Sequence, residues 1–264
     1  MVASEKTIML IAAYNEEENI GYILRQAAML KKAGTISEFV VVDDGSKDDT
    51  SRTAALGGAT VIRVPENRGK GNAVLQGLLH CKNAGAQTVV LADADTVAGV
   101  TQVQVIHLLE ELEGMPSLPK IMMAVYPQSW KDKRTGDIAV TDEYSGFRAV
   151  RMEGLNFLFV PLPDGNGWKF AESFPAKRFI KDAQGYRLEA MLNYRFKKST
   201  RMLARLDSCL ETLPFGRGND NTKRHIRSHI RDCEEKCYMR SYNRLVALTK
   251  RRGMQIVQKV AAVF

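Results

Sequence analysis

The sequence lacks two features that define whole classes of protein, a long apolar run and a dense set of cysteines. In its 264 residues, no apolar run approaches the roughly 18 residues needed to span a bilayer. Four cysteines in a chain of this length do not make a disulfide framework. The first residues lack the basic, apolar and small-residue layout of a signal peptide. We therefore expect a cytoplasmic protein with reduced thiols.

Two common phosphate-binding signatures are missing as well. The chain contains no G-x-x-x-x-G-K-[ST] loop, and no G-x-G-x-x-G follows the first strand-like run. The stretch Gly69-Lys70-Gly71 is too common in loops to replace either of them. These absences argue against a P-loop enzyme and against a dinucleotide site of the Rossmann type.

Positive charge is scarce in the first half of the chain and abundant in the second. Residues 1–119 carry 10 Lys and Arg against 15 Asp and Glu, a net charge of −5. Residues 120–264 carry 28 against 15, a net charge of +13. A basic half favours a polyanionic partner such as a phosphate-rich substrate, an anionic membrane surface or nucleic acid, although a solvated basic face fits the same counts.

Strand and helix signals alternate regularly through the first half. Short apolar runs predict strands, and apolar residues at helical spacing predict helices. The predicted strands are 7–13, 38–42, 60–64, 88–92 and 121–126. The predicted helices are 17–32, 48–56, 71–84 and 100–113. Ser46, three residues before Asp49, predicts a capping box on the second helix. The alternation predicts an α/β fold, Rossmann-like, with a mainly parallel sheet and helices on both faces.

Polar residues follow the ends of the predicted strands, where ligands bind in sheets of this kind. The strand ends read "AAYNEEEN", "VVDDGSKDDT", "ENRGKGNA" and "ADADT". Each of the first two also suits a local structural role, because Asn15 before three glutamates resembles a helix start and Asp43 to Ser46 resembles a turn. Only their convergence on one edge of the sheet favours a binding site.

The pair Asp93 and Asp95 closes an apolar strand with two carboxylates one residue apart. Such carboxylates repel each other unless a cation or solvent intervenes. Mg²⁺ prefers oxygen ligands and is typically held by one or two carboxylates together with substrate phosphates. The pair therefore predicts a metal that carries a diphosphate, with a solvated turn as the structural alternative.

These motifs resemble those of the family 2 glycosyltransferases with the GT-A fold. The resemblance rests on "AAYNEEENI", "VVDDGSKDDT", "NRGKGNAVLQG" and "VVLADADT", in this order and at these spacings. It covers roughly residues 7–150 and extends more loosely through "DEYSGFRAVR" and "QGYRLEAML". Those two stretches are similar to later motifs of polyprenyl-phosphate sugar transferases and glucosyl-phosphoglycerate synthases.

The resemblance implies a role for each matching residue. A nucleotide-sugar donor would contact Asp43 or Asp44 through its base or ribose, and Lys70 through the nucleotide or its phosphates. Asp93 and Asp95 would hold Mg²⁺ or Mn²⁺. The remaining nucleotide-sugar residues would be Ala13, Tyr14, Asn15, Glu16 and Ala94. Ser145, Arg148 and Arg151 would lie on the acceptor and phosphate side, and Asp142, Glu143 and Glu189 are the catalytic candidates.

The chemistry of the acceptor determines whether the reaction needs a catalytic base or phosphate-binding cations. A hydroxyl acceptor needs a carboxylate to take its proton, with Asp142 or Glu143 the first candidate and Glu189 the second. A phosphate acceptor is already a nucleophile and needs cations instead, such as Arg148 and Arg151. The charge of +13 favours a phosphate-bearing acceptor, either a polyprenyl phosphate or a small phosphate ester.

Two further patterns lie near the C-terminus. His225, His229, Cys233 and Cys237 are spaced four apart, but a helix would spread them over about 18 Å, too far for one ion. An ordinary helix is the simpler interpretation, and His225 with His229 stays open as a source of a third metal ligand. Residues 245–264 are basic and moderately amphipathic, which suits packing on the body or on a second subunit in a homodimer, or peripheral binding to the inner membrane face.

We also predict an organisation of the chain. Residues 1–119 would form the nucleotide-sugar-binding half, 120–215 the acceptor-binding half of the same domain, and 216–264 a basic helical extension. A sugar nucleotidyltransferase and a non-catalytic basic nucleotide-binding protein are the alternatives. The acidic loop after the first strand argues against the former, and intact Asp93, Asp95 and Lys70 argue against the latter. The basic segment lacks aromatics for base stacking, so we expect no nucleic-acid partner.

Overall fold

The structure is a computed structural model, and it describes most of the chain up to residue 211. The described ranges are 5–95, 102–113, 121–125, 128–131, 138–142, 146–185, 187–196, 200–202 and 210–211. For residues 128–131, 138–142, 200–202 and 210–211 the description is of the backbone. Within these ranges, none of the helices is both long and apolar enough to cross a membrane.

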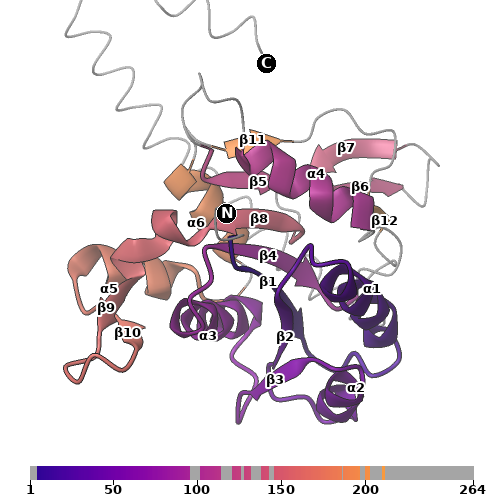
Figure 1. The fold of residues 1–264 in the computed structure, drawn as a ribbon, viewed down its shortest axis with the longest axis horizontal. Coiled ribbons are helices and arrows are strands. Elements are labelled where there is room, and N and C mark those ends of the chain that lie inside the picture. The colour runs from indigo at the N-terminus through magenta and orange to yellow at the C-terminus, as the bar shows by residue number, and fades with distance from the viewer. Residues whose placement is uncertain are drawn as a thin grey trace, which may run out of the picture. The chain divides into compact units, whose positions relative to one another are not determined.

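A seven-stranded sheet forms the centre of the described fold (Figure 1). Its order is β11-β5-β8-β4-β1-β2-β3. The strands are β1 (Thr7–Ala13), β2 (Glu38–Asp43), β3 (Thr60–Arg63), β4 (Thr88–Asp93), β5 (Met123–Val125), β8 (Arg148–Arg151) and β11 (Thr200–Met202). Strands β4, β1, β2 and β3 are parallel neighbours, whereas β8 is antiparallel to both β4 and β5. The predicted mainly parallel sheet is confirmed.

The register aligns the ends of three parallel strands. Ala13 of β1 pairs with Asp43 of β2, and Ala12 pairs with Asp93 of β4. Because carboxyl ends of parallel strands share one edge, Asp43 and Asp44 leave the sheet at the same edge as Asp93, on the other side of β1. The strands can run into the interior because both their faces are apolar, and β1 and β4 are buried along nearly their whole length.

Helices cover both faces of the sheet, so two apolar cores result. One core packs α1 (Ile20–Lys32), α2 (Thr50–Leu56) and α4 (Gln102–Glu113). The other packs α3 (Lys70–Asn83), a 3-10 helix (Met152–Leu158), α5 (Phe174–Asp182) and α6 (Leu188–Phe196). Alternate strand residues supply each core, as Leu10 and Ile11 of β1 do.

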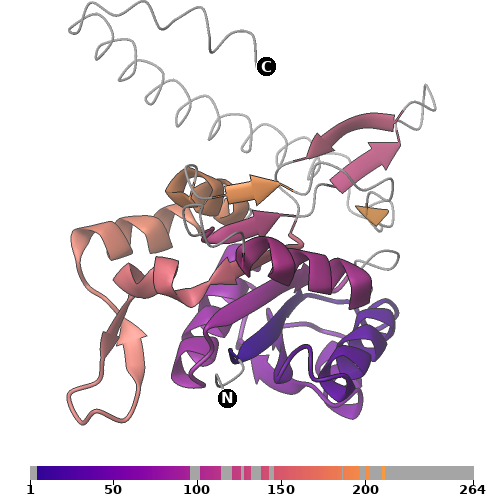
Figure 2. The same ribbon diagram turned by 45° about the horizontal axis from the view of Figure 1, so that its top comes forward.

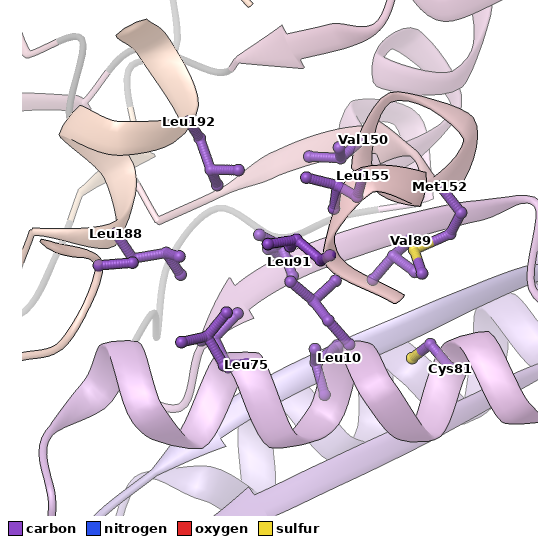
Figure 3. Packing of buried hydrophobic residues seen from close by; sticks show 14 of the residues in the cluster. Leu10, Leu75, Cys81, Val89, Leu91, Val150, Met152, Leu155, Leu188 and Leu192 are labelled. Atoms are coloured by element: carbon purple, nitrogen blue, oxygen red, sulfur yellow. The ribbon is translucent and has the colours of Figure 1, made fainter. Parts of the chain in front are cut away.

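The α6 helix is anchored over the end of β4 by two leucines. Leu188 and Leu192 lie in the same buried cluster as Leu75 of α3 and Leu91 of β4 (Figure 3). This packing fixes the position of Glu189, the residue next to Leu188. It brings a carboxylate of the second half of the chain to the edge of the sheet where Asp93 lies.

Two small sheets complete the described residues (Figure 2). One pairs β9 (Phe159–Pro161) with β10 (Trp168–Phe170) and packs on α3, where Lys82 lies over the Trp168 ring at 4.2 Å. The other contains β6 (Gln128–Lys131), β7 (Ile138–Asp142) and β12 (Leu210–Glu211). The alternation pattern predicted neither small sheet, and the predicted helical extension 216–264 lies outside the described residues.

The predicted helix starts differ from the observed ones at α1 and α2. The α1 helix begins at Ile20 rather than at residue 17, and α2 begins at Thr50 rather than at 48. The predicted capping box is wrong, because the N-cap of α2 is Asp49 and makes no side-chain cap hydrogen bond. Ser46 instead accepts a hydrogen bond from the amide of Asn15 at 2.9 Å, a tertiary contact that replaces the local one.

Candidate active site

The loops after β1 and β2 are joined to each other by hydrogen bonds. Asn15 has a positive φ of 54°, and its Oδ1 accepts a bond from the Lys47 amide at 2.8 Å. The Glu16 amide donates to the Thr50 hydroxyl at 2.8 Å. A left-handed backbone is uncommon outside glycine and is best tolerated by Asn and Asp. These hydrogen bonds therefore fix the Tyr14–Glu16 segment at the sheet edge, where the Tyr14 side chain is exposed.

Asp43 and Asp44 are both buried and both used to shape loops. Asp43 accepts bonds from the Ser46 amide at 2.7 Å and from the Ser51 hydroxyl, so it fixes the turn into α2. The Asp44 carboxylate accepts bonds from the amides of Arg68 at 3.1 Å and Gly69 at 2.7 Å. Asp44 thus positions the loop that leads to Lys70. Contact of either residue with a nucleoside stays a prediction.

Two glycines bring the Lys70 loop against the α5–α6 connection. Gly69 has φ of 90°, in the region that favours glycine. A Cβ on Gly71 would lie 1.9 Å from the carbonyl oxygen of Ala183, and the Gly71 amide donates to the Gly185 carbonyl at 2.6 Å. The backbone approach is closer than any other residue permits. It places Lys70, the first residue of α3, between β4 and α6.

The Lys70 ammonium lies between two carboxylates. Its Nζ is 2.8 Å from both oxygens of Asp93 and 2.6 Å from Oε1 of Glu189. The two carboxylates hold the pKa of Lys70 above its usual value despite burial, with Asp93 contributing more than Glu189. Glu189 is buried, yet the charges of Lys70 and then Arg148 lower its pKa below the usual value. Lys70 and Glu189 are therefore both ionised at neutral pH.

Asp95 lies near Asp93 and Lys70, but the positive charge of Lys70 does not fully offset the cost of ionising its buried carboxyl. Burial and the charge of Asp93 raise its pKa to about 7, against the opposing effect of Lys70. A carboxylate in this state is stabilised by an added cation. The donor set of Asp93 and Asp95 consists of carboxylate oxygens, the ligands that Mg²⁺ and Mn²⁺ prefer, and so the residues present fit such an ion. Among the residues whose side chains are described, no group of three acidic, histidine or cysteine side chains forms a fuller metal cage.

Gly146 leaves the space that the Asp93 side chain occupies. A Cβ at this position would lie 2.1 Å from Oδ2 of Asp93. Two residues further, Arg148 is fully buried in β8 opposite Leu91 and donates to Oδ1 of Asn193 at 3.0 Å. Arg148 therefore lies beneath the cluster, within electrostatic range of Glu189.

Arg151 lies away from this cluster. It pairs with Thr88, at the start of β4, whereas Asp93 is at the end. Its guanidinium donates to the Glu5 carboxylate at 3.1 Å and to the Leu112 carbonyl at 2.9 Å. These contacts tie the N-terminal edge of the sheet to α4. Within the described residues, the structure therefore places Arg151 at the opposite end of β4 from Asp93.

The remaining predicted site residues divide into those described and those not. Ala13 is buried beside Asp43, and Ala94 is buried with its amide donating to the Ala12 carbonyl at 3.2 Å. The backbone of Asp142 ends β7. Outside the described residues lie Glu143, Ser145, His225, His229, Cys233, Cys237 and the segment 245–264.

Several residues that build the site were missed by the sequence analysis. Gly146, Gly185 and Asn193 act through backbone approach or through Arg148, and Thr50 and Ser51 act by holding the first two loops. The glycine of "SGFR" was the one available signal, since it stands beside a predicted site residue. The others carry no pattern that distinguishes them in one sequence.

Comparison with known proteins connects this geometry to a family. Residues 9–113 match the family model described as "Glycosyl transferase family 2". The chain is 30% identical to human dolichyl-phosphate beta-glucosyltransferase over 164 residues, which cover 57% of this chain and 48% of the human protein. It is 31% identical to the Drosophila melanogaster protein of the same name over 206 residues, 68% of this chain and 53% of that protein. The chain thus spans about half the length of these relatives.

Solved structures share the fold. A crystal structure of glucosyl-3-phosphoglycerate synthase from Mycobacterium tuberculosis, in complex with Mn²⁺ and UDP-glucose, superposes with a TM-score of 0.61 at 22% identity. The match covers 89% of this chain and 79% of that chain. A complex of the same enzyme with phosphoglyceric acid gives a TM-score of 0.62 at 18% identity, over 89% of this chain and 80% of the other.

Proposed function

This chain belongs to glycosyl transferase family 2 and has the GT-A fold, and from that premise we propose that it transfers a sugar from a nucleotide-diphosphate sugar to a phosphate-bearing acceptor. The observation that carries the proposal is the group of Asp93, Asp95 and Lys70 at the carboxyl edge of the sheet. Its two carboxylates would bind a metal ion, and its ammonium would bind the diphosphate. The names of the relatives, which include dolichyl phosphate and phosphoglycerate, support the acceptor class.

The donor half of the reaction uses the described cluster. Asp93 and Asp95 would hold Mg²⁺ or Mn²⁺, which when bound offsets the charge that develops on the leaving diphosphate. Lys70 supplies a second positive charge from the loop that Asp44 holds. The Tyr14–Glu16 segment would border the nucleoside, and Asp43 would lie behind it, where it holds the turn into α2. The complexes of the synthase with Mn²⁺ or Mg²⁺ and UDP support this assignment.

The acceptor half depends on the acceptor's chemistry. For a hydroxyl, Asp142 and Glu143 are the candidates for the base. Glu189 is the weaker candidate, because Lys70 and Arg148 stabilise its ionised form and lower its basicity. For a phosphate, no base is needed, and the positive charge of residues 120–264 would hold the acceptor against the donor diphosphate. We favour the phosphate-bearing acceptor, whether a polyprenyl phosphate at a membrane surface or a small soluble ester.

Ligand-induced stabilisation tests the donor half. The full chain is heated with UDP-, GDP- and dTDP-sugars, each with and without Mn²⁺, and its unfolding is followed. A ligand present at 100 times its dissociation constant stabilises the folded state by about 2.7 kcal/mol. We expect one nucleotide class to protect, only with metal, and Asp95→Asn to remove the protection. Metal-independent protection, or no protection by any nucleotide sugar, would contradict the proposal.

A further inference from the structure

Lys70 occupies both oxygens of the residue that the proposed metal requires. An ammonium has three N–H donors, and here its nitrogen lies within 2.8 Å of three carboxylate oxygens, two of Asp93 and one of Glu189. A divalent cation on Asp93 would share those oxygens with a positive group held against them. The ammonium and the metal therefore compete for one carboxylate.

Glu189 gives Lys70 a second place to bind. It comes from α6, which Leu188 and Leu192 anchor in the core, and its oxygen lies closer to Nζ than either Asp93 oxygen does. Lys70 can therefore leave Asp93 without leaving its loop and without losing every anionic partner. The diphosphate of a donor would offer it a replacement for Asp93.

We propose that Lys70 blocks metal binding at Asp93 in the donor-free protein and moves to the diphosphate when metal and nucleotide arrive together. The inference rests on the proposed function. Two consequences follow. The metal alone binds the protein weakly, and added nucleotide tightens metal binding more than chelation of the metal by the nucleotide would by itself. A permanent ion pair between Lys70 and Asp93 would produce no such coupling.

A charge-balanced double variant separates the two cases. Lys70→Met with Glu189→Gln removes one positive and one negative charge, so the net charge near Asp93 is unchanged while its competitor is gone. Arg68→Met with Glu66→Gln is the matched control, because these side chains form an exposed pair at 2.7 Å in the same loop. Binding of Mn²⁺ alone is measured by electron paramagnetic resonance of the free ion, and circular dichroism checks folding.

We expect the Lys70/Glu189 variant to bind Mn²⁺ alone at least tenfold more tightly than the unaltered protein, and the control to stay within twofold. With UDP or, separately, GDP present, nucleotide should strengthen Mn²⁺ binding less in this variant than in the unaltered protein, because no competing ammonium is left for the nucleotide to draw away. Unchanged or weaker binding of Mn²⁺ alone in the variant would overturn the inference.

Two further outcomes are informative. If the double variant does not fold, Glu189→Gln alone leaves Lys70 committed to Asp93 and should weaken Mn²⁺ binding at least threefold, and equal or tighter binding would refute the inference. If the unaltered protein binds no Mn²⁺ even with UDP or GDP, the proposed function fails together with the inference.

Discussion

The approach of the Lys70 loop to the α5–α6 connection predicts opposite effects for two glycine substitutions. Gly71 and Gly21 are each the second residue of a helix, α3 and α1. An added Cβ at Gly71 would meet the Ala183 carbonyl oxygen at 1.9 Å and the Gly185 carbonyl oxygen at 2.8 Å, whereas at Gly21 the nearest atom is the end of the Arg25 side chain at 3.8 Å. The added Cβ at Gly71 meets backbone atoms, which cannot change rotamer to avoid it, whereas the Arg25 side chain near Gly21 can.

The magnitudes follow from these distances. Gly71→Ala must separate the two segments, which costs about 1–3 kcal/mol for overpacking. It also loses the Gly71–Gly185 hydrogen bond, worth about 1 kcal/mol. The better helix propensity of alanine offsets up to about 1 kcal/mol of this loss, so we expect the free energy of unfolding to fall by about 1–4 kcal/mol. Gly21→Ala should raise it by up to about 1 kcal/mol, because alanine is the better helix former.

Urea unfolding followed by circular dichroism measures both changes. The two variants differ in the site of one methyl group, so any general effect of alanine cancels between them. If Gly71→Ala unfolds within about 0.5 kcal/mol of the unaltered protein, the typical range for a surface substitution, the loop does not lie against the α5–α6 connection. The position assigned to Lys70 would then be wrong.

Three further predictions concern single side chains. Asp44→Ala should weaken metal-dependent nucleotide binding at least tenfold in a calorimetric titration, because it frees the loop before Lys70. Lys47→Ala should leave this binding unchanged, because Lys47 contacts Asn15 through its backbone amide. Equal losses of binding in the two variants would refute the distinction. Asp95→Asn should abolish metal-dependent nucleotide binding and leave the unfolding midpoint within about 2 °C, a shift of at most about 1 kcal/mol. Retained binding would contradict the role of Asp95 as a metal ligand. Burial raises the pKa of the Cys81 thiol to about 12, so at pH 8 this thiol should stay protonated and unlabelled by iodoacetamide in the folded protein and react on unfolding. Peptide mass spectrometry locates the label, and fast labelling of Cys81 itself in the folded chain would refute its burial.

The sequence predicted the elements of the first half because their signals are local. The strands β1 to β4 are short apolar runs, and their predicted ends differ from the observed ends by one residue or less. Helix starts were less accurate, because Ser46 and Asn15 satisfy each other across two loops instead of capping their own helices. A local sequence pattern cannot show whether a side chain such as Ser46 caps its own helix or bonds to another loop.

The site was predictable where it follows strand ends and not where distant segments meet. Asp93 and Lys70 were identified as site residues, but their ion pair was not, and neither was the position of Glu189 between Lys70 and Arg148. Arg151 shows the opposite difficulty. It is three residues from Arg148, but in a strand this is about 10 Å. Arg151 pairs with Thr88 at the start of β4, whereas Arg148 pairs with Leu91, two residues before the end of β4.

The proposed function requires that a nucleotide-diphosphate sugar, bound through a metal at Asp93 and Asp95, donates its sugar to an acceptor that carries phosphate. The most direct measurement is mass spectrometry of the products formed from the protecting nucleotide sugar and paired acceptors, each offered with and without its phosphate. One pair is a short polyprenyl phosphate in detergent with its alcohol, and the other is 3-phosphoglycerate with glycerate. The account predicts glycosylated product and free nucleotide from one phosphorylated member, only with Mn²⁺ or Mg²⁺ and not with Asp95→Asn. Preferred transfer to an unphosphorylated member, or turnover that survives Asp95→Asn, would contradict it.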